Sequence, residues 1–189
     1  MFDFLAGCSV IAVTGPMAAG KNYISSQLEK EGWSCVDADI LVHQAIEIAK
    51  DRILDTFTPY AQKKQLKLAR TDGSIDRRAL GKLLFAIPEL LSIQESIVYP
   101  IIIKQIEDFI ASHDKTAINA TVLYKTPELL DHCEKVIFVT CPLLTRLFRA
   151  HKRDKLPFNQ ILKRFYRQRK LLKEYQQALS PEKLFIIKN

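Results

Sequence analysis

The sequence lacks several features that would place a chain in other classes of protein. Its longest apolar run falls far short of the roughly 18 residues needed to span a bilayer, so no membrane association is expected. The first residues include an acidic side chain and no cationic leader, which argues against a secretory signal. The four cysteines are too few for a disulfide scaffold, and their spacing fits no metal site. We therefore expect reduced, buried thiols in a cytoplasmic protein.

The composition is that of an ordinary globular protein with an uneven charge. The chain has 189 residues, of which 48% are hydrophobic and 26% charged, enough for one domain with a core of its own. The formal net charge of +7 favours anionic partners. Eleven of the 28 basic residues lie between positions 143 and 174, opposed there only by Asp154 and Glu174. All of the excess positive charge therefore belongs to this one segment.

Short apolar runs alternate with helical patterns along the chain, which predicts an α/β fold with a parallel sheet and helices on both faces. Strands are expected at 9–14, 33–36, 116–123, 135–140 and 184–187. Helices are expected at about 20–31, 40–50, 75–85, 88–111 (kinked or divided at Pro100) and in the basic region, whereas the stretch before residue 75 is polar and ambiguous. The simplest organisation is a single domain over 1–189, with a helical substrate-binding insertion at about 50–112 and a lid at about 143–178.

A phosphate-binding loop is predicted directly after the first strand. Residues 15–22 read GPMAAGKN and match the pattern G-x-x-x-x-G-K-[ST] at every position except the last. Such a loop turns its backbone N–H groups toward an anion, and the following helix N-terminus adds partial positive charge. The nucleotide-binding candidates here are Gly15, Pro16, Met17, Ala18, Ala19, Gly20, Lys21, Asn22 and Tyr23, with Lys21 placing its charge on the β- and γ-phosphates.

Asn22 is the departure from this pattern. A Ser or Thr hydroxyl at this position normally ligates Mg²⁺. The Asn carbonyl can ligate a hard cation, but it lies one bond further out and its amide is a donor. We expect Asn22 to hold the metal weakly, in part through water, and a hydroxyl here to lower the magnesium requirement. The alternatives are a loop with weakened metal binding and a turn that binds nothing.

Two acidic residues follow the second strand. Asp37 and Asp39 stand where ligands lie in open α/β sheets, outside the carboxyl ends of the strands. A carboxylate there can orient or deprotonate an attacking hydroxyl. If the backbone is extended, only one of the two can face the substrate. Asp39, placed ahead of Ile40, could instead cap the next helix.

The basic segment carries its arginines at helical spacing. Arg149 and Arg153 are four residues apart and share one helix face, and Arg164, Arg167 and Gln168 follow beyond Pro157. One interpretation is a lid whose arginines stabilise the charge of a transferring phosphoryl group. A solvated cationic face and a nucleic-acid-binding surface are the alternatives, although aromatic side chains for base stacking are few there.

Together these motifs resemble the dephospho-coenzyme A kinase family over nearly the whole chain. The matching segments, in order, are IAVTGPMAAGK, VDADILVHQ, GSIDRRALGKLLFAIPE, IVYPII (with Tyr99 in place of a histidine) and RAHKRD followed by LKRFYRQ. The order and spacing of all of them carry the resemblance. Within the last two, Arg149, Arg153, Arg164 and Gln168 match the family's lid.

The resemblance implies a phosphate-loop kinase fold and transfer of the ATP γ-phosphate, with Mg²⁺, to the ribose 3′-hydroxyl of dephospho-coenzyme A. On that mapping Lys21, Asp39 and Arg153 are catalytic and Arg149 contacts ATP. Substrate binding falls to Asp39, Arg77 and Arg78. No nucleic acid is expected as a partner, and the oligomeric state is left open. Other nucleoside or nucleotide kinases, and a nucleotide- or nucleic-acid-binding protein with little turnover, are the alternative functions.

The chain departs from the family pattern at three places besides Asn22. The loop residues Pro16–Ala19 replace a segment that is usually richer in glycine. The family's P-L-L-x-E segment reads VLYKT at 122–126, so its acidic residue is missing. The sequence ends at IKN, about where the family's last strand leads on to a terminal helix.

Overall fold

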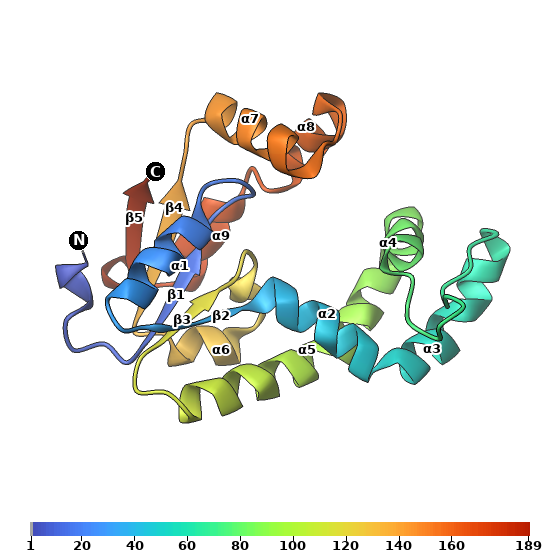
Figure 1. Ribbon diagram of the computed structural model, residues 1–189, viewed down its shortest axis with the longest axis horizontal. Coiled ribbons are helices and arrows are strands. Elements are labelled where there is room, and N and C mark those ends of the chain that lie inside the picture. The colour runs from blue at the N-terminus through green and yellow to red at the C-terminus, as the bar shows by residue number, and fades with distance from the viewer. Residues whose placement is uncertain (1) are drawn as a thin grey trace. The chain divides into compact units, whose positions relative to one another are not determined.

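The computed structural model describes residues 2–189 and contains a five-stranded sheet in the order β2-β3-β1-β4-β5 (Figure 1). All four neighbouring pairs are parallel, so the predicted parallel sheet is confirmed. The strands are β1 (Val10–Thr14), β2 (Ser34–Asp37), β3 (Thr116–Asn119), β4 (Lys135–Thr140) and β5 (Leu184–Lys188). Because β1 is central, the loop that leaves its carboxyl end lies in the middle of the sheet edge.

Helices cover both faces of this sheet, as the alternation of side chains along buried strands requires. Ile11 and Val13 of β1 pack in one hydrophobic cluster with Ile24 and Leu28 of α1 (Lys21–Lys30). On the opposite face, Phe138 of β4 contacts Tyr175 of α9 (Leu171–Ala178), with ring centroids 5.9 Å apart. A short helix, α6 (Pro127–His132), precedes β4. The result is the three-layer architecture expected from the sequence.

The basic region forms two further helices before α9, namely α7 (Leu143–Asp154) and α8 (Phe158–Arg167). Ala150 of α7 and Ile161 and Phe165 of α8 are buried together. We call α7 and α8 the lid helices, after the expected lid segment of the sequence in which they lie.

Residues Ala38–Gln105 form a compact unit separate from the remainder of the chain. It contains α2 (Ala38–Ile48), α3 (Lys50–Lys63), α4 (Arg77–Ala86) and most of α5 (Glu89–Ala111). Helix α3 occupies part of the stretch that the sequence left ambiguous. Its buried residues Ile53, Phe57 and Ala61 recur every four positions, a helical stripe set in otherwise polar sequence.

The structure departs from two expectations about the secondary structure. Helix α5 is one helix of 23 residues that contains Pro100, so the proline does not divide it, and a kink at this residue stays a prediction. Buried side chains on both sides of the proline, such as Ile97 and Ile102, secure the helix despite the lost hydrogen bond. Strand β3 ends at Asn119 rather than at residue 123, because the chain turns into a 3₁₀ segment, Leu123–Lys125. There the buried Tyr175 hydroxyl accepts a hydrogen bond from the Leu123 N–H at 2.9 Å.

All four cysteines are free thiols. Cys8 and Cys133 are buried, while Cys35 and Cys141 are partly buried. Burial raises the pKa of the Cys133 thiol to about 12 and that of Cys35 to about 11, so both stay protonated at neutral pH. Over residues 2–189, none of the helices has the length and apolarity to cross a membrane.

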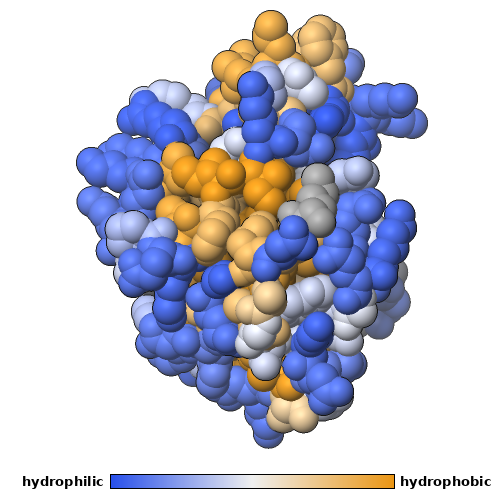
Figure 2. All heavy atoms as spheres, turned by 90° about the vertical axis from the view of Figure 1, so that its left-hand side faces the viewer, coloured by the Kyte–Doolittle hydropathy of each residue, from blue (hydrophilic) through white to orange (hydrophobic). Residues whose placement is uncertain are grey.

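The outer edge of the sheet at β5 leaves apolar side chains on the surface. Ile186 is 53% exposed, and with Leu179, Pro181 and Leu184 it lines a shallow hollow beside the strand. Figure 2, which views this side of the molecule, shows an apolar area surrounded by hydrophilic residues.

Candidate active site

The phosphate loop (residues 15–20) owes its shape to three residues with positive φ. Gly15 has φ 144° and Gly20 φ 107°, and Ala18 adopts the left-handed region at φ 61°. A Cβ atom on Gly15 would collide with the Val139 carbonyl of β4, so only glycine fits there. At Ala18 a non-glycine residue thus adopts a conformation that glycine adopts more readily.

Lys21 begins helix α1 directly behind this loop. Its Nζ donates a hydrogen bond to the Gly15 carbonyl at 3.3 Å, so the side chain folds back along the loop. The ammonium group therefore lies over the backbone that would hold phosphates, where the helix N-terminus adds positive potential. Tyr23, also a candidate from the sequence, is 55% exposed on α1.

Asn22 is bonded to a residue that the sequence did not point to. Asn119, the last residue of β3, is 5% exposed, and its Nδ2 donates to Asn22 Oδ1 at 3.0 Å. In the register of the sheet Asn119 lies opposite Asp37, the last residue of β2. The oxygen that was expected to approach the metal is thus already a hydrogen-bond acceptor inside the protein.

The lid helices bring two of the predicted arginines to the loop. Arg149 and Arg153 line a hollow of about 240 Å³ together with Ala18, Gly20, Lys21 and Asn22. Both residues lie on α7, where a spacing of four residues favours a shared helix face. Arg149 also donates to the Cys141 sulfur at 3.5 Å.

Asp154 orders the cationic side of this hollow. Arg153 donates to both of its carboxylate oxygens, at 2.7 and 3.2 Å, and Arg164 approaches within 3.8 Å. The hydrogen bond from Arg153 holds the pKa of the Asp154 carboxyl below its usual value. Asp154, which the sequence showed only as an isolated acid in a basic run, pairs with two lid arginines.

Three side chains from distant parts of the chain hold the backbone of the phosphate loop, and we call them the loop anchors. Gln168, at the end of α8, accepts a hydrogen bond from the Met17 N–H at 2.7 Å. Arg146 Nε of α7 donates to the Met17 carbonyl at 2.9 Å. Asn189 Nδ2, beyond β5, donates to the Ala19 carbonyl at 3.0 Å. The sequence indicated only Gln168, through the resemblance, and gave no sign that it contacts the loop.

Arg146 differs from the other lid arginines by its burial. Its guanidinium carbon lies 4.2 Å from the centre of the Phe165 ring, and burial lowers its pKa. One of its two terminal guanidinium nitrogens, Nη2, is buried without a hydrogen-bond partner. Because Arg146 contacts both Phe165 of α8 and the Met17 carbonyl, it links α7 and α8 to the loop. Its burial leaves it poorly placed to contact a substrate.

Three candidates lie in the Ala38–Gln105 unit. Asp39 is the second residue of α2 and lies within its first turn. The capping alternative required Asp39 to precede the helix, so its position differs from that alternative. The condition of an extended backbone through Asp37 and Asp39 is not met, because the strand ends at Asp37 and the helix begins at Ala38. Arg77 and Arg78 are exposed at the start of α4. Asp76 caps this helix, and its carboxylate accepts a hydrogen bond from the Arg78 N–H at 2.9 Å.

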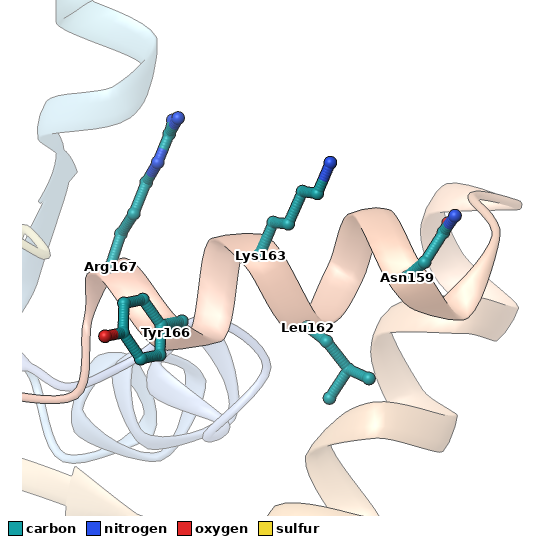
Figure 3. A pocket seen from close by; sticks show the side chains of 5 residues that line it. All are labelled: Asn159, Leu162, Lys163, Tyr166 and Arg167. Atoms are coloured by element: carbon teal, nitrogen blue, oxygen red, sulfur yellow. The ribbon is translucent and has the colours of Figure 1, made fainter.

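A larger hollow, about 500 Å³, is lined by residues of α8 (Figure 3). Lys163 and Arg167 extend from one side of the helix, and Leu162 and Tyr166 from the other. None of the loop residues lines it. Of these two hollows, the smaller one combines loop backbone, a lysine and arginines.

A phosphate-loop kinase is the class of protein that this sheet, loop and lysine define. The solved structures agree on the fold. A Thermus thermophilus crystal structure superposes with a TM-score of 0.73 at 22% identity, over 96% of this chain and 88% of the other. A dephospho-CoA kinase from Campylobacter jejuni superposes at 0.62 with 23% identity, over 95% and 87%.

Sequence comparison identifies the family. The family model described as dephospho-CoA kinase matches residues 9–180. A dephospho-CoA kinase from Treponema pallidum is 34% identical over 167 residues, which is 86% of this chain and 79% of that protein. The chain belongs to the dephospho-CoA kinase family.

Proposed function

We propose that this chain transfers the γ-phosphate of ATP to the ribose 3′-hydroxyl of dephospho-CoA. One observation carries the proposal beyond family membership. A phosphate loop with its lysine is faced by two lid arginines across a single hollow. That arrangement suits phosphoryl transfer, in which catalysis consists of positioning and of neutralising charge on the transferring group.

The loop N–H groups and Lys21 would hold the β- and γ-phosphates, with Tyr23 at the rim. Arg149 would contact ATP, and Arg153 would neutralise charge that develops during transfer. Asp39 would receive the proton of the attacking hydroxyl, while Arg77 and Arg78 would bind the acceptor substrate. The residues around 50–112 would then serve as the substrate-binding insertion, and those around 143–178 as the lid.

Magnesium, which kinases of this class use, does not fit as an ion held directly at position 22. Both Asn22 and Asn119 are neutral amides, and the Asn22 oxygen already accepts a hydrogen bond. Among residues 2–189 there is no group of three or more His, Cys, Asp or Glu side chains that could hold a metal. We propose that Mg²⁺ arrives with the phosphates of ATP and meets position 22 only through water, and we derive no step through the ion.

The test is a coupled assay of ADP formation with purified protein. Dephospho-CoA should be turned over well above adenosine and AMP, and coenzyme A should appear in the product by mass spectrometry. An analogue of dephospho-CoA with hydrogen in place of the 3′-hydroxyl should be inert. Preference for another acceptor in the panel, or turnover of the deoxy analogue, would contradict the proposal. A cytoplasmic location is part of the same proposal and is testable by cell fractionation.

The role of Asp39 is testable in the same assay. Asp39→Asn should lower kcat by about 10²–10⁴-fold, the usual effect of removing a general base. ATP affinity should change little, because the loop and Lys21 hold the phosphates. Asp37→Asn is the matched control and should be less damaging. If Asp37→Asn proves the worse of the two, the two carboxylates have the opposite roles.

A further inference from the structure

The hydrogen bond between Asn22 and Asn119 joins the phosphate hollow to the buried end of β3. Asn22 is exposed in the hollow beside Lys21, whereas Asn119 is 5% exposed below it. Asn119 Nδ2 donates to Asn22 Oδ1 at 3.0 Å. A planar amide carries its oxygen and nitrogen on opposite sides of the same carbon. With the oxygen turned to Asn119, the Asn22 Nδ2 donor is turned away from it.

This pair stands where phosphate-loop enzymes commonly place their magnesium ligands. There a hydroxyl follows the loop lysine, and an aspartate on a neighbouring strand completes the site. Here the residue after the lysine is Asn22, and the buried strand residue that touches it is Asn119. Two neutral amides bonded to each other offer no charge to a cation. An N–H group cannot ligate a metal, but it can donate to a phosphate oxygen.

The neighbouring strand supplies an electrostatic reason for an amide at position 119. Asp37 lies directly opposite Asn119 in the parallel register, and paired residues of a sheet share a face. An aspartate at position 119 would therefore put two carboxylates side by side. Two carboxylates on paired residues of neighbouring strands would require a cation between them or the protonation of one. Asn119 removes this requirement.

We infer that Asn22 binds a phosphate oxygen of the nucleotide through its Nδ2 group and that Asn119 is the positioning residue that orients it. The inference rests on the proposed function only in taking a nucleoside polyphosphate as the ligand of the loop. It follows that the loop holds its nucleotide with little help from magnesium. A hydroxyl at position 22 alone would then not create a metal site, because Asn119 would remain an amide.

The experiment measures ADP affinity by calorimetry, once with Mg²⁺ and once with EDTA. For the wild-type protein the two dissociation constants should agree within about threefold. Asn22→Ser combined with Asn119→Asp restores the hydroxyl and the carboxylate. In EDTA this double variant should bind ADP at least about tenfold more weakly than wild type, the loss expected for a hydrogen bond to a charged group. Added Mg²⁺ should restore most of that affinity.

Single variants separate the two residues. Asn119→Ala should keep the fold but lower ADP affinity several-fold in EDTA, because the Asn22 amide loses its orientation. Asn22→Ser alone should lose affinity in EDTA and recover little with Mg²⁺. Asn159→Ser, which lines the other hollow on α8, is the matched control and should behave as wild type. Thermal unfolding of each variant distinguishes loss of fold from loss of binding.

Three results would overturn the inference. The first is a wild-type dissociation constant for ADP that is at least about thirtyfold higher in EDTA than with Mg²⁺. The second is a folded double variant whose ADP affinity depends on Mg²⁺ no more than that of wild type, and the third is absence of ADP binding in both conditions. If the double variant does not fold, the wild-type comparison decides the matter by itself. Failure of the proposed function would give a different result. Dephospho-CoA would not be turned over, but ADP binding and its dependence on Mg²⁺ would be unchanged.

Discussion

The phosphate loop and the lid helices contribute to the same hollow by different means. The loop offers backbone, and its shape is fixed by glycines with positive φ and by the anchors Arg146, Gln168 and Asn189. The lid offers charged side chains on exposed helix faces, and Arg153 shares the carboxylate of Asp154 with Arg164. We therefore expect the loop to be sensitive to the loss of a single contact, and the lid, which carries several cations, to tolerate the loss of one.

Among changes to the loop and the lid, replacing the loop lysine should have the largest effect. Lys21→Ala removes the ammonium group that lies over the loop and should lower turnover at least about a hundredfold, since each 1.36 kcal/mol of lost transition-state stabilisation is about tenfold in rate. Circular dichroism should be unchanged. Lys30→Ala, at the exposed end of the same helix, is the control and should retain full turnover. A Lys21→Ala protein with more than roughly a tenth of wild-type activity would refute the assigned role.

Breaking a loop anchor should come next. Gln168→Leu keeps the side-chain size but leaves the Met17 N–H without its acceptor. An unsatisfied donor costs about 1–3 kcal/mol, so chemical denaturation should show a loss of this size. ADP affinity should fall by about tenfold as the loop loosens. Gln160→Leu, exposed on α8, should leave both unchanged, and equal effects of the two variants would show that the Met17 contact does not shape the loop.

Removing one lid arginine should cost less than removing the loop lysine. Arg153→Ala should lower turnover by about tenfold, because Arg149 remains in the hollow and Arg164 remains beside Asp154. The matched control is Lys163→Ala, which removes a cation that lines the other hollow on α8 (Figure 3). A loss as large as that of Lys21→Ala would mean that the lid cations do not substitute for one another.

The smallest effect should be a gain in stability within the loop. Ala18 adopts the left-handed conformation, which costs a non-glycine residue roughly 1–2 kcal/mol. Glycine removes that cost but loses about 0.4–1 kcal/mol through the entropy of the unfolded chain. Ala18→Gly should therefore stabilise the protein by about 0.5–1 kcal/mol in chemical denaturation. Ala19→Gly, at a buried position without positive φ, should destabilise the protein. If both variants change the free energy of unfolding in the same direction, relief of strain at Ala18 is ruled out.

Elements with strong periodicity could be predicted closely from the sequence. Strand β4 matches its predicted range of 135–140, because its apolar run is short and rich in β-branched side chains, which favours a buried strand over a helix. Helix α3 was left open because polar residues separate Ile53, Phe57 and Ala61. The end of β3 depends on a hydrogen bond to Tyr175, more than fifty residues further on, which no local pattern can reveal.

The sequence by itself determined the phosphate loop, the lysine and the helical spacing of Arg149 and Arg153, because these depend on residues close together in the chain. Only the tertiary structure decided that Arg146 is an anchor while Arg149 faces the hollow, since burial against Phe165 distinguishes two arginines that look alike in the basic run. It also decided the partner of Asn22. Asn119 is 97 positions away, and only the pairing of β3 with β1 brings its amide to the start of α1.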